Sequence, residues 1–100
     1  MTLDDFIASL KHEKAPTGLS APLRALWHAA RDDWDGAHGI VQAESSQEAA
    51  WVHAYLHRVE GDLANAGYWY RRARRDVSNE TLEAEWRSIV STLLGSGTTG

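Results

Sequence analysis

Two histidines one helical turn apart are the residues of this sequence best placed to do chemistry. His53 and His57 are separated by four positions, so on a helix both imidazoles lie on the same face, and Glu60 follows one turn later. This spacing lets two imidazoles bind one metal ion, and a carboxylate can add a further ligand. One hypothesis for the function is therefore a metal-binding protein that uses His53, His57 and Glu60.

The same histidines have a second interpretation, as half-buried polar residues of the core. Ala54 stands where a zinc protease carries its catalytic glutamate between the two histidines, and the sequence fixes no third ligand. His28 occupies the position equivalent to the second histidine in an internal repeat, and a position used twice favours a role in packing. In this interpretation both rings form hydrogen bonds with Tyr68, Asn65 or an acidic neighbour.

A second candidate site is a stripe of large side chains, Trp51, Tyr55 and Arg58, on another face of the same helix. Aromatic and arginine side chains recur in binding hot spots because they lose little conformational entropy for the contact area they make. The stripe therefore predicts a surface for a protein or peptide partner. The alternative is that the N-terminal or the C-terminal helix lies over the stripe and makes it part of the core.

Aromatic residues adjoin a basic run further along the chain. Tyr68, Trp69 and Tyr70 cannot all face one way on a helix, and we expect Tyr70 in the core. The other two, with Arg72, extend the predicted partner surface or join two copies of the chain in a homodimer. The four arginines at positions 71, 72, 74 and 75 are typical of a solvated helix C-terminus, with contact to RNA or to a phosphorylated ligand as the alternative.

The composition disfavours several classes of protein. The 100 residues carry a formal net charge of −4, which makes nucleic acid a poor partner, and the absence of Cys excludes disulfides and cysteine-ligated metal. The sequence contains no glycine-rich phosphate loop and no nucleophile elbow, so we expect no enzyme activity and no cofactor. The acidic N-terminus does not resemble a signal peptide, and no run of 18 apolar residues occurs, so we expect a cytoplasmic protein without a membrane partner.

These residues have to be positioned by helices, and a repeat in the sequence indicates how. Residues 25–42 align with residues 54–71 at an offset of 29, which indicates a duplicated helical hairpin. We place the hairpins at about residues 21–44 and 47–74. The first turns at Asp32 and Asp33, and the second turns at Gly61 and Asp62, where glycine tolerates unusual backbone angles and aspartate caps the next helix.

Flanking helices complete an all-α domain of about six helices over residues 1–95. The first runs from Leu3 to about His12 with Thr2 as its N-cap, and the last from Asn79 or Glu80 to about Leu94. Ser45 and Glu48 have the spacing of a capping box before the second hairpin. Trp27, Trp34 and Trp86 are expected in the core, and residues 96–100 are expected to form a mobile tail.

The second hairpin resembles a tetratricopeptide repeat. The residues that carry this resemblance lie at that family's turn and helix-contact positions: Ala54, Gly61, Asp62, Leu63, Ala66, Tyr70 and Ala73. The resemblance implies a scaffold that holds a peptide or protein, with Trp51, Tyr55 and Arg58 on its inner face. The first hairpin departs from the pattern because Asp32 replaces the turn glycine, and the period is 29 residues where the family has 34. Residues 50–73 also resemble small uncharacterised bacterial proteins, which implies no activity.

Overall fold

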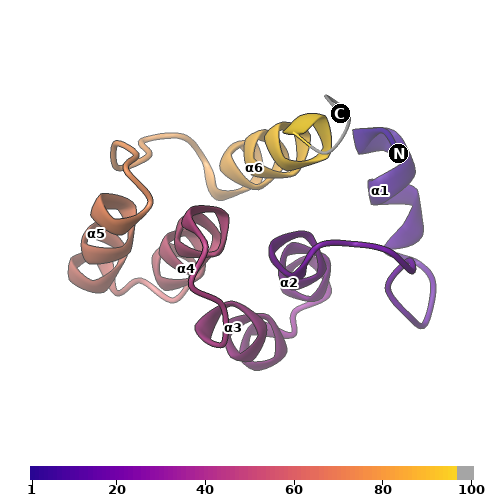
Figure 1. Cartoon of the computed structure of the whole chain (residues 1–100), viewed down its shortest axis with the longest axis horizontal. Helices are drawn as coiled ribbons and strands as arrows, with labels where there is room; N and C mark the ends of the chain where they lie inside the picture. Colours follow the sequence, from indigo (N-terminus) through magenta and orange to yellow (C-terminus); the bar gives the residue numbers. More distant parts are fainter. Residues whose placement is uncertain (97–100) are drawn as a thin grey trace.

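The computed structural model describes residues 1–96, and these fold into six α-helices without a β-strand. The helices are α1 (Leu3–Ser9), α2 (Ala21–Ala30), α3 (Trp34–Gln42), α4 (Gln47–Val59), α5 (Leu63–Arg72) and α6 (Leu82–Ser96) (Figure 1). The all-α prediction is confirmed. No helix in this part of the chain combines the length and the apolar character needed to cross a bilayer. The predicted mobile tail, apart from Ser96 at the end of α6, lies outside the described residues.

Both predicted hairpins form, and each turns at its aspartate. Asp33 caps α3 and Asp62 caps α5, each carboxylate accepting a hydrogen bond from the amide three residues later, at 3.0 and 3.2 Å. The residue before each cap has a positive φ, 60° at Asp32 and 86° at Gly61. Glycine adopts this conformation without strain, and aspartate tolerates it better than most residues do. We call α2 with α3 hairpin 1, and α4 with α5 hairpin 2.

The N-terminal caps of α1 and α4 compare differently with prediction. Thr2 caps α1 as predicted. Its hydroxyl accepts a hydrogen bond from the amide of Asp5, and the Asp5 carboxylate accepts one from the amide of Thr2. Helix α1 nevertheless ends three residues earlier than predicted. The predicted capping box of Ser45 and Glu48 is wrong. The cap of α4 is Ser46, one residue after the predicted position, because its hydroxyl accepts a hydrogen bond from the amide of Ala49 at 3.0 Å.

Helix α4 lies at the centre of the molecule, with α2, α3, α5 and α6 packed against it (Figure 1). All of its residues from Ala49 to His57 are buried. Three indole groups connect neighbouring helices by donating hydrogen bonds: Trp27 to the Ser9 hydroxyl, Trp34 to the Leu56 carbonyl and Trp86 to the Leu26 carbonyl. Trp27 and Trp86 are buried and Trp34 is half-buried against the core, so their predicted packing role is confirmed.

Helix α6 covers the face of α4 that carries Trp51, Tyr55 and Arg58. Trp51 and Tyr55 are each only 7% exposed, and Arg58 forms an ion pair with Glu85 of α6 at 2.8 Å. Of the two alternatives that the sequence leaves open, the one found is therefore a stripe covered by the C-terminal helix. These three side chains offer no open surface to a partner in this structure.

Glu85 is the centre of a buried polar cluster that joins α6 to hairpin 2. It is 2% exposed, and its carboxylate accepts hydrogen bonds from Arg58 and from the hydroxyl of Tyr70. Arg58 also donates to the carbonyl of Glu80, just before α6. Burial and the hydrogen bond to Glu85 raise the pKa of Tyr70, so its hydroxyl stays protonated and able to donate. The cluster thus holds a carboxylate in the interior with one cation and one neutral donor.

Removing the cation from this cluster should destabilise the protein. Arg58→Ala leaves the Glu85 carboxylate buried without its counter-charge, and we expect a loss of about 2–3 kcal/mol in the free energy of unfolding, measured by urea titration. Arg87→Ala is the matched control, because Arg87 forms an exposed ion pair with Glu83, both on α6, at 3.6 Å. That control should lose less than about 0.5 kcal/mol. Equal losses in the two variants would contradict the role given to Glu85.

Candidate metal centre

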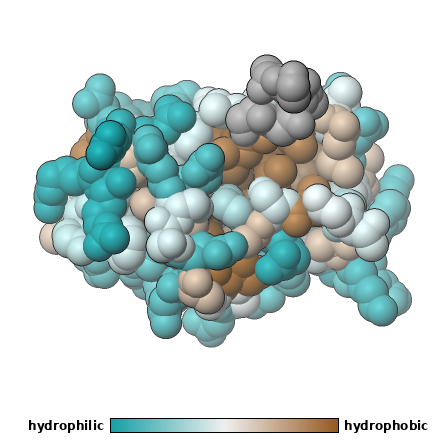
Figure 2. All heavy atoms as spheres, in the orientation of Figure 1, coloured by the Kyte–Doolittle hydropathy of each residue, from teal (hydrophilic) through white to brown (hydrophobic). Residues whose placement is uncertain are grey.

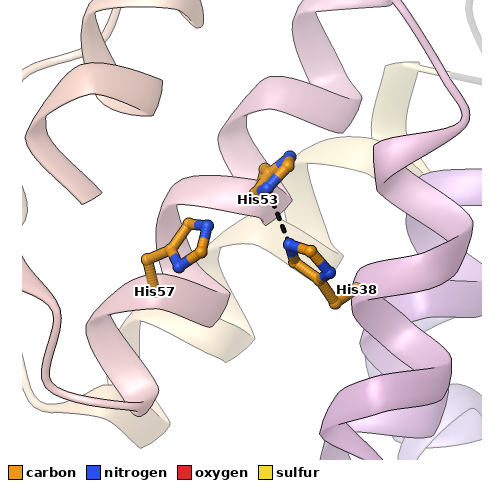
Figure 3. A group of neighbouring side chains, drawn as sticks. All are labelled: His38, His53 and His57. Carbon is orange, nitrogen blue, oxygen red and sulfur yellow. Dashed lines mark hydrogen bonds between the residues drawn. The ribbon is translucent and has the colours of Figure 1, made fainter. Parts of the chain in front are cut away.

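Three histidines from two helices come together beside α4. His53 and His57 project from α4, and His38 projects from α3 of the preceding hairpin, with the rings turned toward one another (Figure 3). One nitrogen from each ring lies within 4.8 Å of the nitrogens of the other two. The Nε2 atoms of His53 and His38 are 3.1 Å apart, a hydrogen-bond distance. The sequence predicted the first two residues of this group and missed the third.

The packing of α3 on α4 positions His38. Trp34 begins α3 and lies one turn before His38, and the two rings stack with centroids 4.6 Å apart and an interplanar angle of 11°. The indole nitrogen of Trp34 donates to the carbonyl of Leu56 on α4 at 2.7 Å. The tryptophan therefore fixes the start of α3 against α4 and holds the His38 ring at the same time.

A second tryptophan bounds the cluster on the side of hairpin 2. The ring of Trp69 on α5 stacks on His53 with centroids 3.8 Å apart and an interplanar angle of 10°. The guanidinium of Arg72 lies 5.2 Å from the centroid of Trp69. Because each imidazole plane is pressed against an indole plane, rotation of His38 and His53 about their side-chain bonds is restricted.

Glu60 does not belong to the three-histidine group. Its carboxylate lies 2.6 Å from Nδ1 of His57, and this contact directs the other ring nitrogen, Nε2, toward the cluster. Glu60 is thus placed to orient a ligand, which differs from the predicted role as a ligand of the same ion as both histidines. The acidic neighbour expected in the structural interpretation is also found, since the hydrogen-bond partners of the two predicted histidines are Glu60 and His38.

Burial keeps two of the three rings, His38 and His53, uncharged at neutral pH. Burial, and after it the nearby rings of His38 and His57, lower the pKa of His53 to about 4. The pKa of His38 is also lowered, first by burial and then by His57. At neutral pH these two rings are therefore neutral, and in the hydrogen bond between them one Nε2 donates and the other accepts. The neutral imidazole is the form that coordinates a metal ion, once the donating ring moves its proton to Nδ1.

The residues predicted for partner binding divide between the core and the surface. Trp51, Tyr55 and Arg58 lie under α6, as described above. Tyr68 is 44% exposed on α5 and its hydroxyl accepts a hydrogen bond from Arg72 at 3.0 Å. Figure 2 shows that the surface over α5, on the left in that view, is mainly hydrophilic. What is left of the predicted interface is a small polar face that includes the half-buried Trp69.

One signal in the sequence pointed to His38. Positions 34, 37, 38 and 41 form a single stripe on the second helix of hairpin 1, and Ala37 and Val41 of this stripe are fully or almost fully buried. A histidine inside an otherwise apolar stripe has to face the neighbouring helix. Reading the stripe with its polar member included would have placed His38 opposite the face of α4 that carries the other two histidines.

The lowered pKa values predict that the metal-free protein loses stability on acidification. His53 titrates near its ordinary value of 6.5 when unfolded and near 4 when folded, so between these values the unfolded chain binds more protons. The resulting stabilisation is fully present above pH 6.5 and is lost as the pH falls to about 4. It amounts to roughly 3 kcal/mol at most. Urea unfolding at a series of pH values measures it.

Two variants separate this effect from general acid unfolding. His53→Gln should flatten the dependence of the free energy of unfolding on pH between 4 and 6.5. His12→Gln changes an exposed histidine outside the cluster and should retain the wild-type slope. A wild-type slope in His53→Gln would show that this ring is not held neutral by its surroundings.

The chain matches no family model, no curated protein and no solved structure. The resemblance to tetratricopeptide repeats therefore stays a prediction. The chemistry of the three-histidine cluster has to be inferred from its own geometry.

Proposed function

We propose that this protein binds one divalent transition-metal ion through His38, His53 and His57. The observation that carries the proposal is the convergence of three ring nitrogens from two helices within 4.8 Å. Two nitrogens that share a tetrahedral zinc ion at 2.0–2.1 Å lie about 3.3 Å apart. The 3.1 Å between Nε2 of His53 and Nε2 of His38 is already close to this value. To bind one ion, the two rings have to turn so that both lone pairs point at the metal instead of along the line between the nitrogens.

The donor set defines the class of metal. Three imidazoles suit zinc, nickel, cobalt and copper, whereas magnesium and calcium require oxygen ligands. The contact between Glu60 and His57 supplies the carboxylate that commonly orients a metal-ligating histidine and raises its basicity. The neutral state of His53 and His38 means that few protons have to leave these rings when the ion binds.

The ion would connect the two hairpins. His38 belongs to hairpin 1, and His53 and His57 belong to hairpin 2. A metal bound to all three adds its binding free energy to the packing of α3 on α4, since an unfolded chain does not hold the ligands together. In this proposal the metal stabilises the junction of the hairpins, and no catalytic activity is assigned.

Zinc or nickel added to the untagged, metal-free protein should bind at one ion per chain and raise the melting temperature. At a free-ion concentration about 100 times Kd the expected stabilisation is about 2.7 kcal/mol, which corresponds to roughly 10–20 °C for a domain of this size. Isothermal titration calorimetry gives the stoichiometry, and thermal melting gives the shift. A melting temperature that does not respond to either ion would remove the proposal.

Variants assign the ligands. Glu60→Gln should weaken binding by about 10–100-fold, and His38→Ala should weaken it more because a direct ligand is lost. His28→Ala is the matched control. His28 is the repeat counterpart of His57 but lies in hairpin 1 beside Asp33, at 3.3 Å, away from the cluster. The His28→Ala variant should bind the metal ion with wild-type affinity. Wild-type affinity in His38→Ala would show that the ion is held elsewhere.

A second candidate function is recognition of a protein, including a second copy of this chain, by Tyr68, Trp69 and Arg72. It is favoured by the exposure of Tyr68 and by the hydrogen bond from Arg72 that holds its hydroxyl in place. Light scattering tests the self-associating form. The average mass should rise above 11.1 kDa with concentration, and Tyr68→Ser combined with Arg72→Ser should abolish the rise. A constant mass equal to that of one chain would exclude this form.

A further inference from the structure

The nitrogen of His57 that faces the cluster is accessible to solvent. Its Nδ1 is engaged by Glu60, while its Nε2 has no hydrogen-bond partner within residues 1–96. In the same part of the chain, no fully buried side-chain nitrogen or oxygen lacks a partner. Nε2 of His57 must therefore reach the surface, although the residue as a whole is only 6% exposed. The exposed part of the His57 side chain thus includes this nitrogen.

The cluster also lacks a fourth protein ligand among the described residues. The three-histidine group contains three nitrogens, whereas Glu60 lies at the far nitrogen of His57 and forms a separate group with His57 and Asp62. Trp34 and Trp69, which bound the cluster, carry only indole N–H donors and cannot ligate. A tetrahedral ion needs four ligands, and sites with three protein ligands complete their shell with water.

We propose that the metal bound by His38, His53 and His57 keeps one exchangeable coordination position on its solvent side, and that this position takes a small anion in place of water. The inference rests on the proposed function and adds a ligand class to it. None of the three imidazole ligands is anionic, and the Glu60 carboxylate acts on the ion only through His57, which favours an anionic fourth ligand. The guanidinium of Arg72 over Trp69 adds positive charge nearby.

The surrounding side chains restrict this ligand to a few atoms. The indoles of Trp34 and Trp69 are stacked on the rings of His38 and His53 and close the cluster on two sides. We therefore expect only small anions, such as azide, thiocyanate and hydroxide, to bind between them. A phosphorylated peptide or a nucleotide would have to displace Trp34 or Trp69, each of which also contacts α4.

Cobalt(II) tests the inference, because its visible absorption bands respond to the number and type of ligands. The metal-free protein is first loaded with one equivalent of cobalt(II), and binding is measured by calorimetry. Sodium azide is then titrated into the loaded protein. We expect the visible bands to shift and to saturate at one azide per cobalt, with the ion still bound to the protein after gel filtration.

The controls keep the two proposals apart. Failure of cobalt, zinc and nickel to bind would overturn the proposed function, and the further inference with it. Cobalt that binds with bands unaffected by azide would leave the metal site standing and overturn the exchangeable position. Azide bound with equal affinity by the metal-free protein, measured by calorimetry, would assign the anion to the arginines of α5 and also overturn it. The Arg72→Ala variant loaded with cobalt should retain the azide shift with weaker affinity.

Discussion

Helix α4 is enclosed by other helices from Ala49 to His57, and this enclosure determines where the polar chemistry of the protein occurs. A buried polar group without a partner costs about 1–3 kcal/mol, so each polar side chain on the helix has to be matched by a neighbour. His53 is matched by His38 of α3, and Arg58 is matched by Glu85 of α6. Two sides of α4 thus pair with different helices, α3 and α6, and both the fold and the candidate site follow from those pairings.

The polar side chains on the two sides of α4 are buried in opposite charge states. Toward α6 the charge is kept, because the Arg58 cation and the Tyr70 hydroxyl both contact the Glu85 carboxylate. Toward α3 the charge is given up, because burial lowers the pKa of His53 and His38 and leaves neutral rings. The first arrangement has its full set of partners inside the protein. The second leaves neutral rings whose nitrogens lie close together, and this is the arrangement on which the proposed metal site rests.

The sequence was sufficient for features that depend on neighbours along the chain. The turns at Asp33 and Asp62, the cap at Thr2 and the order of the helices were all predicted, because capping and periodicity act within a few residues. It was insufficient for features that depend on packing between helices. No local pattern fixes the path of residues 73–81, which brings α6 over Trp51, and none fixes the angle at which α3 meets α4 and carries His38 to the cluster.

The internal repeat explains why the three-histidine cluster forms once within residues 1–96, at the junction of the hairpins. His28 and His57 are equivalent: their carbonyls accept from the amides of Asp33 and Asp62 at 3.0 and 2.9 Å. Yet the position equivalent to His53 in hairpin 1 is the exposed Arg24, so hairpin 1 does not repeat the pair of histidines found on α4. A helix pair alone provides at most two of the three rings. The third has to come from the second helix of a preceding hairpin, so the chemistry of the site depends on the stacking of two repeats and is absent from either one by itself.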